Sequence, residues 1–236
     1  MNIPAYWRTV NAPWGKLFYM LLWNHLEYQG KDILDFGSGF GLTAAHLAKK
    51  NRVVAVEPNR DMLTFQVGQD SYCQVEGDAR WLASLPEKSF DVILCHNVLE
   101  YVQDREGLLT QFHRLLKEQG ELSLVKHNKL GKVMQKAVFE NDTAAAMALL
   151  RGEDTISENF GQIREYDREE LDGYLSGRFQ IDHVYGIRTF FGLQRNEFKE
   201  KESWLNDMFL LETQVEERSP FREVAFYHHL LLKKIS

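Results

Sequence analysis

The chain has 236 residues, 44% of them hydrophobic and 26% charged, which is typical of a globular protein with one sizeable core. No apolar run approaches the ~18 residues of a membrane span, so we expect no membrane partner and a cytoplasmic location. The net charge of -6 gives no general attraction to nucleic acid. Cys73 and Cys95 lie in apolar runs without metal-ligand spacing, so we expect buried thiols and no metal.

Aromatic and aliphatic residues recur at helical spacing over residues 13–28 and follow a proline, which favours the start of a helix. We expect residues 1–30 to form an N-terminal helical cap near a ligand site. Lys16 in this helix has two interpretations: a solvated surface lysine, or a contact to the carboxylate of a ligand.

Residues 31–57 contain an apolar run, a glycine-rich turn, an amphipathic segment and a second apolar run that ends at Glu57. This order predicts a strand, a turn, a helix and a strand, the opening of a doubly wound sheet. The glycines of the turn allow positive φ angles and close approach of a ligand, and Glu57 is placed to accept hydrogen bonds from a ribose.

The spacing of the turn, Asp35-x-Gly37-x-Gly39-x-Gly41, differs from a dinucleotide fingerprint, whose third glycine comes one residue later. Asp35 would also repel a pyrophosphate, so the pattern favours a cationic ligand that carries a ribose. The pattern resembles the first motif of the class I S-adenosylmethionine-dependent methyltransferases. The resemblance implies S-adenosyl-L-methionine as cofactor; the alternative is a turn that only packs a helix on a sheet.

The next two elements each contain a residue that could contact the cofactor. Residues 58–63 read as a helix capped by Asn59, in which Met62 resembles the residue that lies against the adenine, or is a core methionine. A short strand over residues 72–75 leads to Asp78, which resembles the adenine-reading acid of the family, or caps the helix at residues 79–84.

The continuous apolar run within residues 90–101 predicts a central parallel strand, with His96 and Asn97 at its carboxyl end in the ligand crevice. This run resembles the fourth-strand motif of the same methyltransferases; His96 is a cofactor contact or a structural histidine. A helix over 104–117, a turn at 118–120 and a fifth strand over 121–125 follow. The expected cofactor-binding residues are Lys16, Asp35, Gly37, Ser38, Gly39, Gly41, Glu57, Pro58, Met62, Gly77, Asp78, Ala79, His96 and Asn97.

Residues 126–166 depart from the minimal pattern, and we expect them to form a lid insertion. Lys129, Lys132 and Lys136 would share one helical face, either as a phosphate-contacting patch or as a solvated surface. A helix is expected over 141–150 and a mobile loop over 151–166.

The last third of the chain reads as a helix capped by Asp167 and Glu170, a strand over 179–191, a helix over 198–217 and a strand over 223–234. We therefore expect one α/β domain over residues 1–236. Its sheet should be Rossmann-like, seven-stranded, mostly parallel and doubly wound, with the N-terminal helix and the helical lid after strand five.

Four further segments resemble the bacterial tRNA 5-carboxymethoxyuridine methyltransferases: H-N-V-L-E-Y-V from His96, K-H-N-K-L-G from Lys126, G-I-R-T-F-F from Gly186 and L-L-E-T-Q from Leu210. The chain departs from them in the N-terminal helix, where Phe18 or Lys16 stands near the place of a cofactor-contacting arginine.

The resemblance implies methylation of a carboxylate on a modified tRNA uridine, with Arg188 holding that carboxylate. A carboxylate needs no general base, whereas a hydroxyl or amine would need one, and His127 and Tyr166 are the candidates. Alternatives are a methyltransferase for a small-molecule metabolite and a non-catalytic adaptor that binds S-adenosylmethionine.

Overall fold

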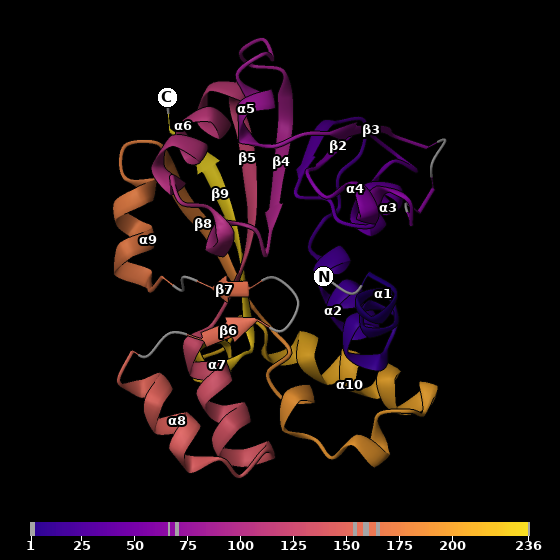
Figure 1. Cartoon of the computed structure of the whole chain (residues 1–236), viewed down its shortest axis with the longest axis vertical. Coiled ribbons are helices and arrows are strands. Elements are labelled where there is room, and N and C mark those ends of the chain that lie inside the picture. Colours follow the sequence, from indigo (N-terminus) through magenta and orange to yellow (C-terminus); the bar gives the residue numbers. More distant parts are fainter. Residues whose placement is uncertain are drawn as a thin grey trace. The chain divides into compact units, whose positions relative to one another are not determined.

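The computed structural model describes residues 3–65, 67–68, 71–152, 155–157, 161–163 and 166–235. A seven-stranded sheet with the order β3-β2-β1-β4-β5-β9-β8 runs through the fold (Figure 1). Its strands are β1 Asp32–Phe36, β2 Arg52–Glu57, β3 Cys73–Glu76, β4 Phe90–His96, β5 Leu116–His127, β8 Phe179–Ile187 and β9 Tyr227–Lys234. The neighbours from β3 to β5 pair in parallel. The predicted seven-stranded, doubly wound sheet is therefore confirmed.

Two more strands, β6 Thr155–Ser157 and β7 Gly161–Ile163, pair antiparallel in the segment that we predicted to be a loop. That prediction is wrong for these residues. Both strands are only three residues long, so the periodicity that marks a strand is too short to read from the sequence.

The helices are marked by capping residues more clearly than by periodicity. Asn59, Asp78 and Asp167 accept backbone N–H groups at the starts of α4, α5 and α9, as predicted, and Asp167 and Glu170 complete a capping box. The α-helices are α1 Ile3–Val10, α2 Pro13–Asn24, α3 Leu42–Leu47, α4 Arg60–Leu63, α5 Ala79–Leu82, α6 Arg105–Leu115, α7 Lys129–Met134, α8 Thr143–Leu150, α9 Arg168–Leu175 and α10 Glu202–Val215.

Shorter helical segments complete the fold: 3-10 turns at Leu99–Tyr101, Phe191–Leu193, Asn196–Phe198 and Arg222–Val224, and a π-helix at Gln135–Phe139. The predicted helix at residues 13–28 begins at Pro13 but ends at Asn24, and α1 precedes it.

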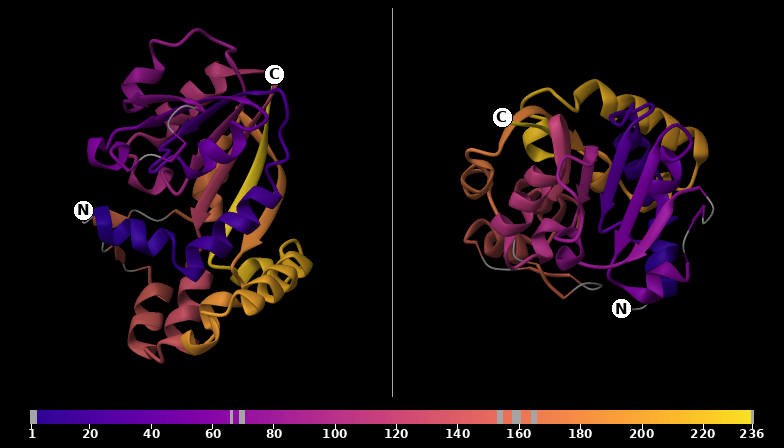
Figure 2. Two further views of the ribbon diagram at one scale, coloured as in Figure 1. Left: turned by 90° about the vertical axis from the view of Figure 1, so that its right-hand side faces the viewer. Right: turned by 90° about the horizontal axis from the view of Figure 1, so that it is seen from above.

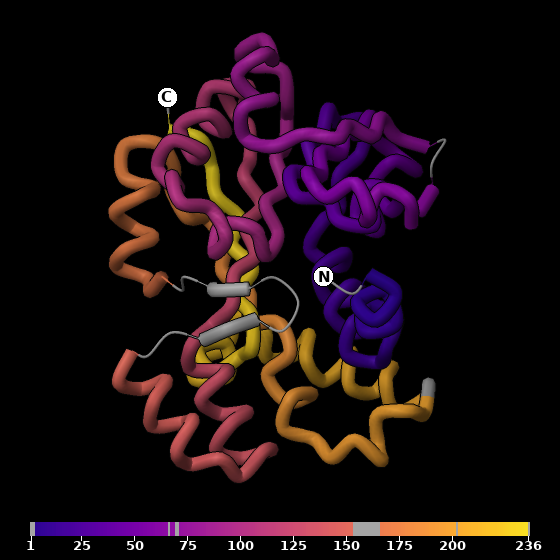
Figure 3. The backbone as a smooth tube through the Cα atoms, viewed as in Figure 1, coloured from indigo at the N-terminus to yellow at the C-terminus, as the bar shows by residue number. Residues whose placement is uncertain are grey.

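The chain divides into two compact units, and each is described by itself. We call residues 26–125, 166–183 and 230–236 the glycine-loop unit, and residues 1–25, 126–165 and 184–229 the insertion unit. Strands β5, β8 and β9 each begin in one unit and end in the other. The same elements can be followed in the turned views and in the backbone trace (Figures 2 and 3). The expected arrangement of one domain with a cap and a lid stays a prediction.

The core of the glycine-loop unit lies along β1 and β4, which pair in parallel with Leu34 opposite Ile93. Both side chains are fully buried, as are Ile33 and Leu94 beside them. Parallel strands covered on both faces read as continuous apolar runs, which explains why these strands were readable from the sequence. Burial of each side chain contributes about 1.5–3 kcal/mol. Cys95 is buried next to them, whereas Cys73 is exposed, contrary to our expectation, because it lies on the edge strand β3.

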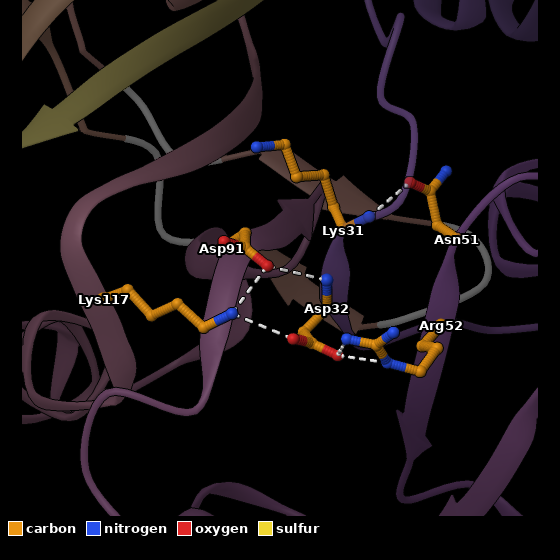
Figure 4. A network of polar contacts seen from close by, with 6 residues as sticks. All are labelled: Lys31, Asp32, Asn51, Arg52, Asp91 and Lys117. Atoms are coloured by element: carbon orange, nitrogen blue, oxygen red, sulfur yellow. Dashed lines mark hydrogen bonds and ion pairs between the residues drawn. The ribbon is translucent and has the colours of Figure 1, made fainter.

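An ion-pair network joins the starts of β1 and β4 (Figure 4). Lys117 Nζ lies 2.9 Å from Asp32 Oδ2 and 2.8 Å from Asp91 Oδ2. Arg52 Nε donates to Asp32 Oδ1 over 2.6 Å. These two cations lower the pKa of Asp32 from 3.8 to about 2.

Strand β5, which contains Lys117, differs from the sequence prediction. Residues 118–120 form a bulge inside β5 instead of a turn before it: Phe90 pairs with Leu116, but Val92 pairs with Glu121. The glycine of the bulge, Gly120, gave the signal of a turn, while the strand continues on both sides of it.

The insertion unit is held together by a buried polar cluster at the end of α2. His25 Nε2 lies 2.9 Å from Glu216 Oε2, and His25 Nδ1 lies 2.9 Å from His229 Nδ1. The ring of Tyr185 stacks on His25 at 4.0 Å. In the same unit, Asn128 donates to the carbonyls of Glu223 and Ala225. These bonds connect segments about 100 or more residues apart in the sequence.

Candidate functional site

The turn after β1 adopts the backbone conformation that its glycines predict. Gly37, Gly39 and Gly41 have φ angles of 76°, 56° and 74°. The N–H groups of Gly37 and Ser38 donate to the carbonyl of Val56 over 2.8 and 3.0 Å. The turn is therefore hydrogen-bonded to the end of β2, in a conformation that residues with a Cβ rarely adopt.

The three glycines differ in what surrounds them. A Cβ at Gly41 would overlap the hydroxyl of Tyr72, and one at Gly37 would overlap Val98. Of the described atoms around Gly39, only Met62 Sδ would lie within 4 Å of an added Cβ, at 3.8 Å. Packing thus requires Gly37 and Gly41, whereas Gly39 presents its backbone where a ligand can approach. Met62 is buried beside it, which fits either interpretation of this methionine.

Glu57 is the last residue of β2, and backbone groups hold its carboxylate in place. Its Oε2 accepts the N–H of Gly39 over 2.9 Å, and its Oε1 accepts the N–H of Asn59 over 2.8 Å. The side chain is buried, which raises its pKa. Each carboxylate oxygen has a second lone pair, so Glu57 can still accept hydrogen bonds from the hydroxyls of a ribose.

Asp35 in the middle of this site is a buried acid with an unsatisfied oxygen. The residue is 3% exposed, and its Oδ2 has no hydrogen-bond partner among the described residues. Burial and the charge of Glu57 raise its pKa from 3.8 to about 7. A buried carboxylate is costly unless a cation or a donor accompanies it. A ligand that carries a positive charge would satisfy it.

Two other predicted cofactor residues have buried polar atoms without partners in the described part of the chain. They are Ser38 Oγ and Asn97 Oδ1. Asn97 directly follows β4 with a φ angle of 55°, and its N–H donates to Val125 over 2.9 Å. His96 lies before it with Nε2 2.8 Å from Ser123 Oγ, and burial lowers the pKa of His96 to about 3. His96 is therefore a neutral imidazole at physiological pH.

The next edge of the site is formed after β3. The N–H of Gly77 donates to the carbonyl of Glu57 over 3.2 Å, which brings residues 77–79 next to the acid of β2 and Pro58. Asp78 accepts the N–H of Arg80 over 2.9 Å as the cap of α5, with Ala79 as its first residue. The side chain of Arg80 also pairs with Asp78. The capping interpretation is confirmed, and contact of Asp78 with the cofactor stays a prediction.

The other predicted site residues, Lys16, His127 and Arg188, belong to the insertion unit. Lys16 is exposed on α2. His127 ends β5 and is half-buried against the rings of Tyr227 and Phe226, at 4.9 and 6.1 Å between centroids. The roles of all three stay predictions.

Arg188 is the most unusual side chain of the insertion unit. It directly follows β8 with a φ angle of 65° and is 8% exposed. Its guanidinium carbon lies 5.0–5.7 Å from the centroids of four aromatic rings: Trp14, Phe191, Phe226 and Tyr227. The guanidinium donates to the Tyr227 hydroxyl, but Nε has no partner among the described residues. Rings stabilise the cation without neutralising it, so a donor remains for an anion.

Sequence reasoning missed the residues that position Arg188. Glu212 on α10 is fully buried, and its carboxylate accepts the N–H groups of Thr189, Phe190 and Phe191 over 2.7, 2.8 and 3.0 Å. These bonds hold the turn after Arg188 in place. An acid within an otherwise apolar stretch of a helix was the available signal. Three of the four rings around Arg188, those of Trp14, Phe226 and Tyr227, come from distant segments and gave no local signal.

Tyr166, a candidate base for a hydroxyl or amine acceptor, lies in the glycine-loop unit. Arg105 packs over its ring at 4.7 Å. Burial and the charge of Glu100 raise the pKa of Tyr166 well above its ordinary value of 10. Tyr166 therefore stays protonated at neutral pH and is a poor base.

Within the described residues, no group of three or more His, Cys, Asp or Glu side chains is arranged to hold a metal ion. No helix in those ranges has the length and hydropathy needed to cross a membrane.

The strand order is that of the class I S-adenosylmethionine-dependent methyltransferase fold. The left-handed glycine turn and the acid at the end of β2 lie where the sequence pattern predicts a cofactor site. Residues 34–124 match the protein family described as a methyltransferase domain. The chain is an S-adenosylmethionine-dependent methyltransferase, and S-adenosyl-L-methionine is its cofactor. The unpartnered oxygen of Asp35 and the open backbone at Gly39 fit this cationic ligand.

One similar protein is the tRNA 5-carboxymethoxyuridine methyltransferase of Escherichia coli, which is 26% identical over 93% of this chain and 89% of its own length. Solved structures share the fold. A possible histamine N-methyltransferase of Thermotoga maritima has a TM-score of 0.64 at 18% identity and covers 99% of this chain and 96% of its own. The Burkholderia thailandensis 1,6-didemethyltoxoflavin N1-methyltransferase, solved with bound S-adenosylhomocysteine, has a TM-score of 0.57 at 16% identity over 97% and 80%.

Proposed function

We propose that this methyltransferase acts in the cytoplasm on tRNA and methylates a carboxylate on a modified uridine. Arg188 holds this carboxylate. The observation that carries the proposal is the buried guanidinium of Arg188, with its unpartnered Nε and its four surrounding rings. An arginine forms directional, charge-assisted hydrogen bonds with a carboxylate. The similarity to the Escherichia coli enzyme along 93% of the chain supports the choice of acceptor.

The residues of the glycine-loop unit suit the cofactor. Asp35 would hold its positively charged amino group, Glu57 its ribose, and Asp78 its adenine, while Gly39 allows close approach of the backbone. S-adenosylmethionine, when bound, supplies a methyl group activated by a sulfonium, and the electron pair of the broken bond goes to sulfur.

An ionised carboxylate is already a nucleophile at neutral pH, so no residue has to remove a proton. The protonated state of Tyr166 agrees with such an acceptor. Under this proposal Arg188 fixes the carboxylate for in-line attack, which is the main contribution that a protein makes to this kind of transfer. With a hydroxyl or amine acceptor, His127 would be the candidate base instead.

Contacts with the tRNA backbone are assigned to Lys129, Lys132 and Lys136. All three are half-buried along α7 and the π-helix, and Lys136 pairs with Glu140 over 2.6 Å.

The net charge of -6 favours the second candidate, a small-molecule acceptor. Affinity for a tRNA falls steeply with salt concentration, by about one power of concentration for each phosphate contact, whereas affinity for a metabolite changes little.

The test is the transfer of labelled methyl to tRNA that carries 5-carboxymethoxyuridine. Arg188→Ala should reduce kcat/KM by about 100-fold, because the loss of a charge-assisted hydrogen bond and its partner costs about 3 kcal/mol. Arg195→Ala is the matched control, since Arg195 is an exposed arginine of the same unit, paired with Glu197. Full turnover by Arg188→Ala would refute the role of Arg188.

A cell extract incubated with labelled cofactor and then separated into RNA, protein and small molecules decides between the acceptors. Label in RNA supports the proposal, and label in the small-molecule fraction supports the second candidate. Cofactor binding without methyl transfer to any fraction would identify a non-catalytic adaptor.

A further inference from the structure

Lys199 is a second cation at the ring that Arg188 contacts. Its Nζ lies 4.8 Å from the centroid of Phe191, and the guanidinium carbon of Arg188 lies 5.0 Å from the same centroid. Lys199 also packs over Phe139 at 4.6 Å and donates to Asn196 Oδ1 over 3.0 Å. The lysine is half-buried, so packing against its neighbours restricts the position of its side chain.

The charges around Phe191 do not balance. Burial and the charge of Arg188 lower the pKa of Lys199, and burial lowers the pKa of Arg188. Glu212 is the acid whose charge acts on Arg188, but its oxygens already accept three backbone N–H groups. Two cations thus lie against one ring, and among the described residues Glu212 is the carboxylate whose charge acts on Arg188. An anion bound there would relieve their repulsion.

We propose that Lys199 and Arg188 together bind the carboxylate of the acceptor, so that Lys199 determines specificity for an ionised acceptor. The identity of this anion rests on the proposed function. Arg188 offers a directional donor, and Lys199 offers a compact charge that can approach a carboxylate oxygen from another side.

The pair also explains how product could leave. Methylation converts the acceptor carboxylate into a neutral ester: one carboxylate oxygen forms the new bond to carbon, the bond from carbon to sulfur breaks, and no proton moves. The ester has lost the charge that two cations attract. The site therefore binds substrate more tightly than product, and each cation contributes to that difference.

Binding of anions can be measured without any methyl transfer. The lysines of the intact protein are dimethylated with a carbon-13 label, which keeps their charge, and the signal of Lys199 is assigned as the one lost in Lys199→Arg. Acetate, inorganic phosphate and neutral acetamide are then titrated. We expect acetate to shift the Lys199 signal saturably and acetamide to leave it unchanged, with Lys201, an exposed neighbour, as internal control.

Variants of Arg188 connect the two cations. Arg188→Met should abolish the acetate response of Lys199, and Arg188→Lys, which keeps a charge but lacks Nε, should weaken it, provided that both variants melt cooperatively. Equal shifts at Lys199 and Lys201, no response to acetate, or a response to phosphate alone would overturn the proposal.

Kinetics separate this inference from the proposed function. Lys199→Met should raise the KM for the acceptor about tenfold and leave kcat and the KM for the cofactor unchanged, whereas Lys201→Met should change neither. A saturable acetate response in a protein that methylates no tRNA would refute the proposed function and retain the anion site. Methylation of tRNA with an unchanged KM in Lys199→Met would refute the inference alone.

Discussion

Asp35→Asn should stabilise the protein without cofactor and weaken its binding of S-adenosylmethionine. Asparagine has the same shape as aspartate and keeps an oxygen to accept the N–H of Ala44. It removes a buried charge whose Oδ2 has no partner in the described part of the chain. The substitution therefore separates the electrostatic contribution of Asp35 from its packing.

The magnitude follows from the pKa of Asp35. Burial and Glu57 raise this pKa from 3.8 to about 7. The folded chain then keeps a proton that the unfolded chain releases, so the free energy of unfolding falls as pH rises from about 4 to about 7. Above pH ~7 the buried charge of Asp35 has lowered the free energy of unfolding by about 4 kcal/mol, because each unit of pKa difference corresponds to 1.36 kcal/mol. Asp35→Asn should recover up to that amount at pH ~8.5 and little at pH ~4.

Urea unfolding of the protein without cofactor, at several pH values, measures the first effect, and calorimetric titration with S-adenosylmethionine measures the second. The affinity of the wild-type protein should rise with pH up to about 7, where Asp35 ionises while the amino group of the cofactor is still charged. The affinity of Asp35→Asn should be at least tenfold lower at pH ~7.5 and nearly independent of pH below that value. Glu87→Gln, at an exposed acid of the same unit, should change neither quantity. Equal destabilisation of Asp35→Asn at all pH values, or unchanged affinity, would refute this reasoning.

Two further substitutions test the frame around the site. Gly41→Ala should cost more than 2 kcal/mol in urea unfolding, because its Cβ would overlap the Tyr72 hydroxyl, whereas Gly30→Ala, with a similar φ angle of 67° and nothing within 4 Å, should cost only about 1 kcal/mol. Equal losses would contradict the role of Tyr72. Lys117→Met should cost about 1 kcal/mol at neutral pH. That loss should shrink as pH falls from about 4 to about 2, because Asp32 becomes protonated in the unfolded chain near pH 3.8 and in the folded chain near pH 2. Lys88→Met, which removes an exposed pair with Glu118, should change the unfolding midpoint little, and a larger effect there would contradict the argument.

Local sequence was sufficient for the cofactor half of the molecule. The elements around Gly37 and Glu57 lie within 27 residues, and their signals are short-range: apolar runs for buried parallel strands, glycines for positive φ angles, and Asn or Asp for helix caps. Right-handed parallel connections then restrict how these strands can be ordered in the sheet. The class of enzyme could therefore be predicted from the sequence.

The environment of each charged side chain was decided only by the tertiary structure. Asp35 acquires a pKa near 7 because strands on both sides exclude water and bring Glu57 close, and neither effect has a local pattern. Three rings around Arg188 come from Trp14, Phe226 and Tyr227, and its turn depends on Glu212. Residues so far apart in sequence meet only when the chain folds. The sequence by itself thus determined the cofactor motif, while long-range packing decided the protonation of Asp35 and the surroundings of Arg188.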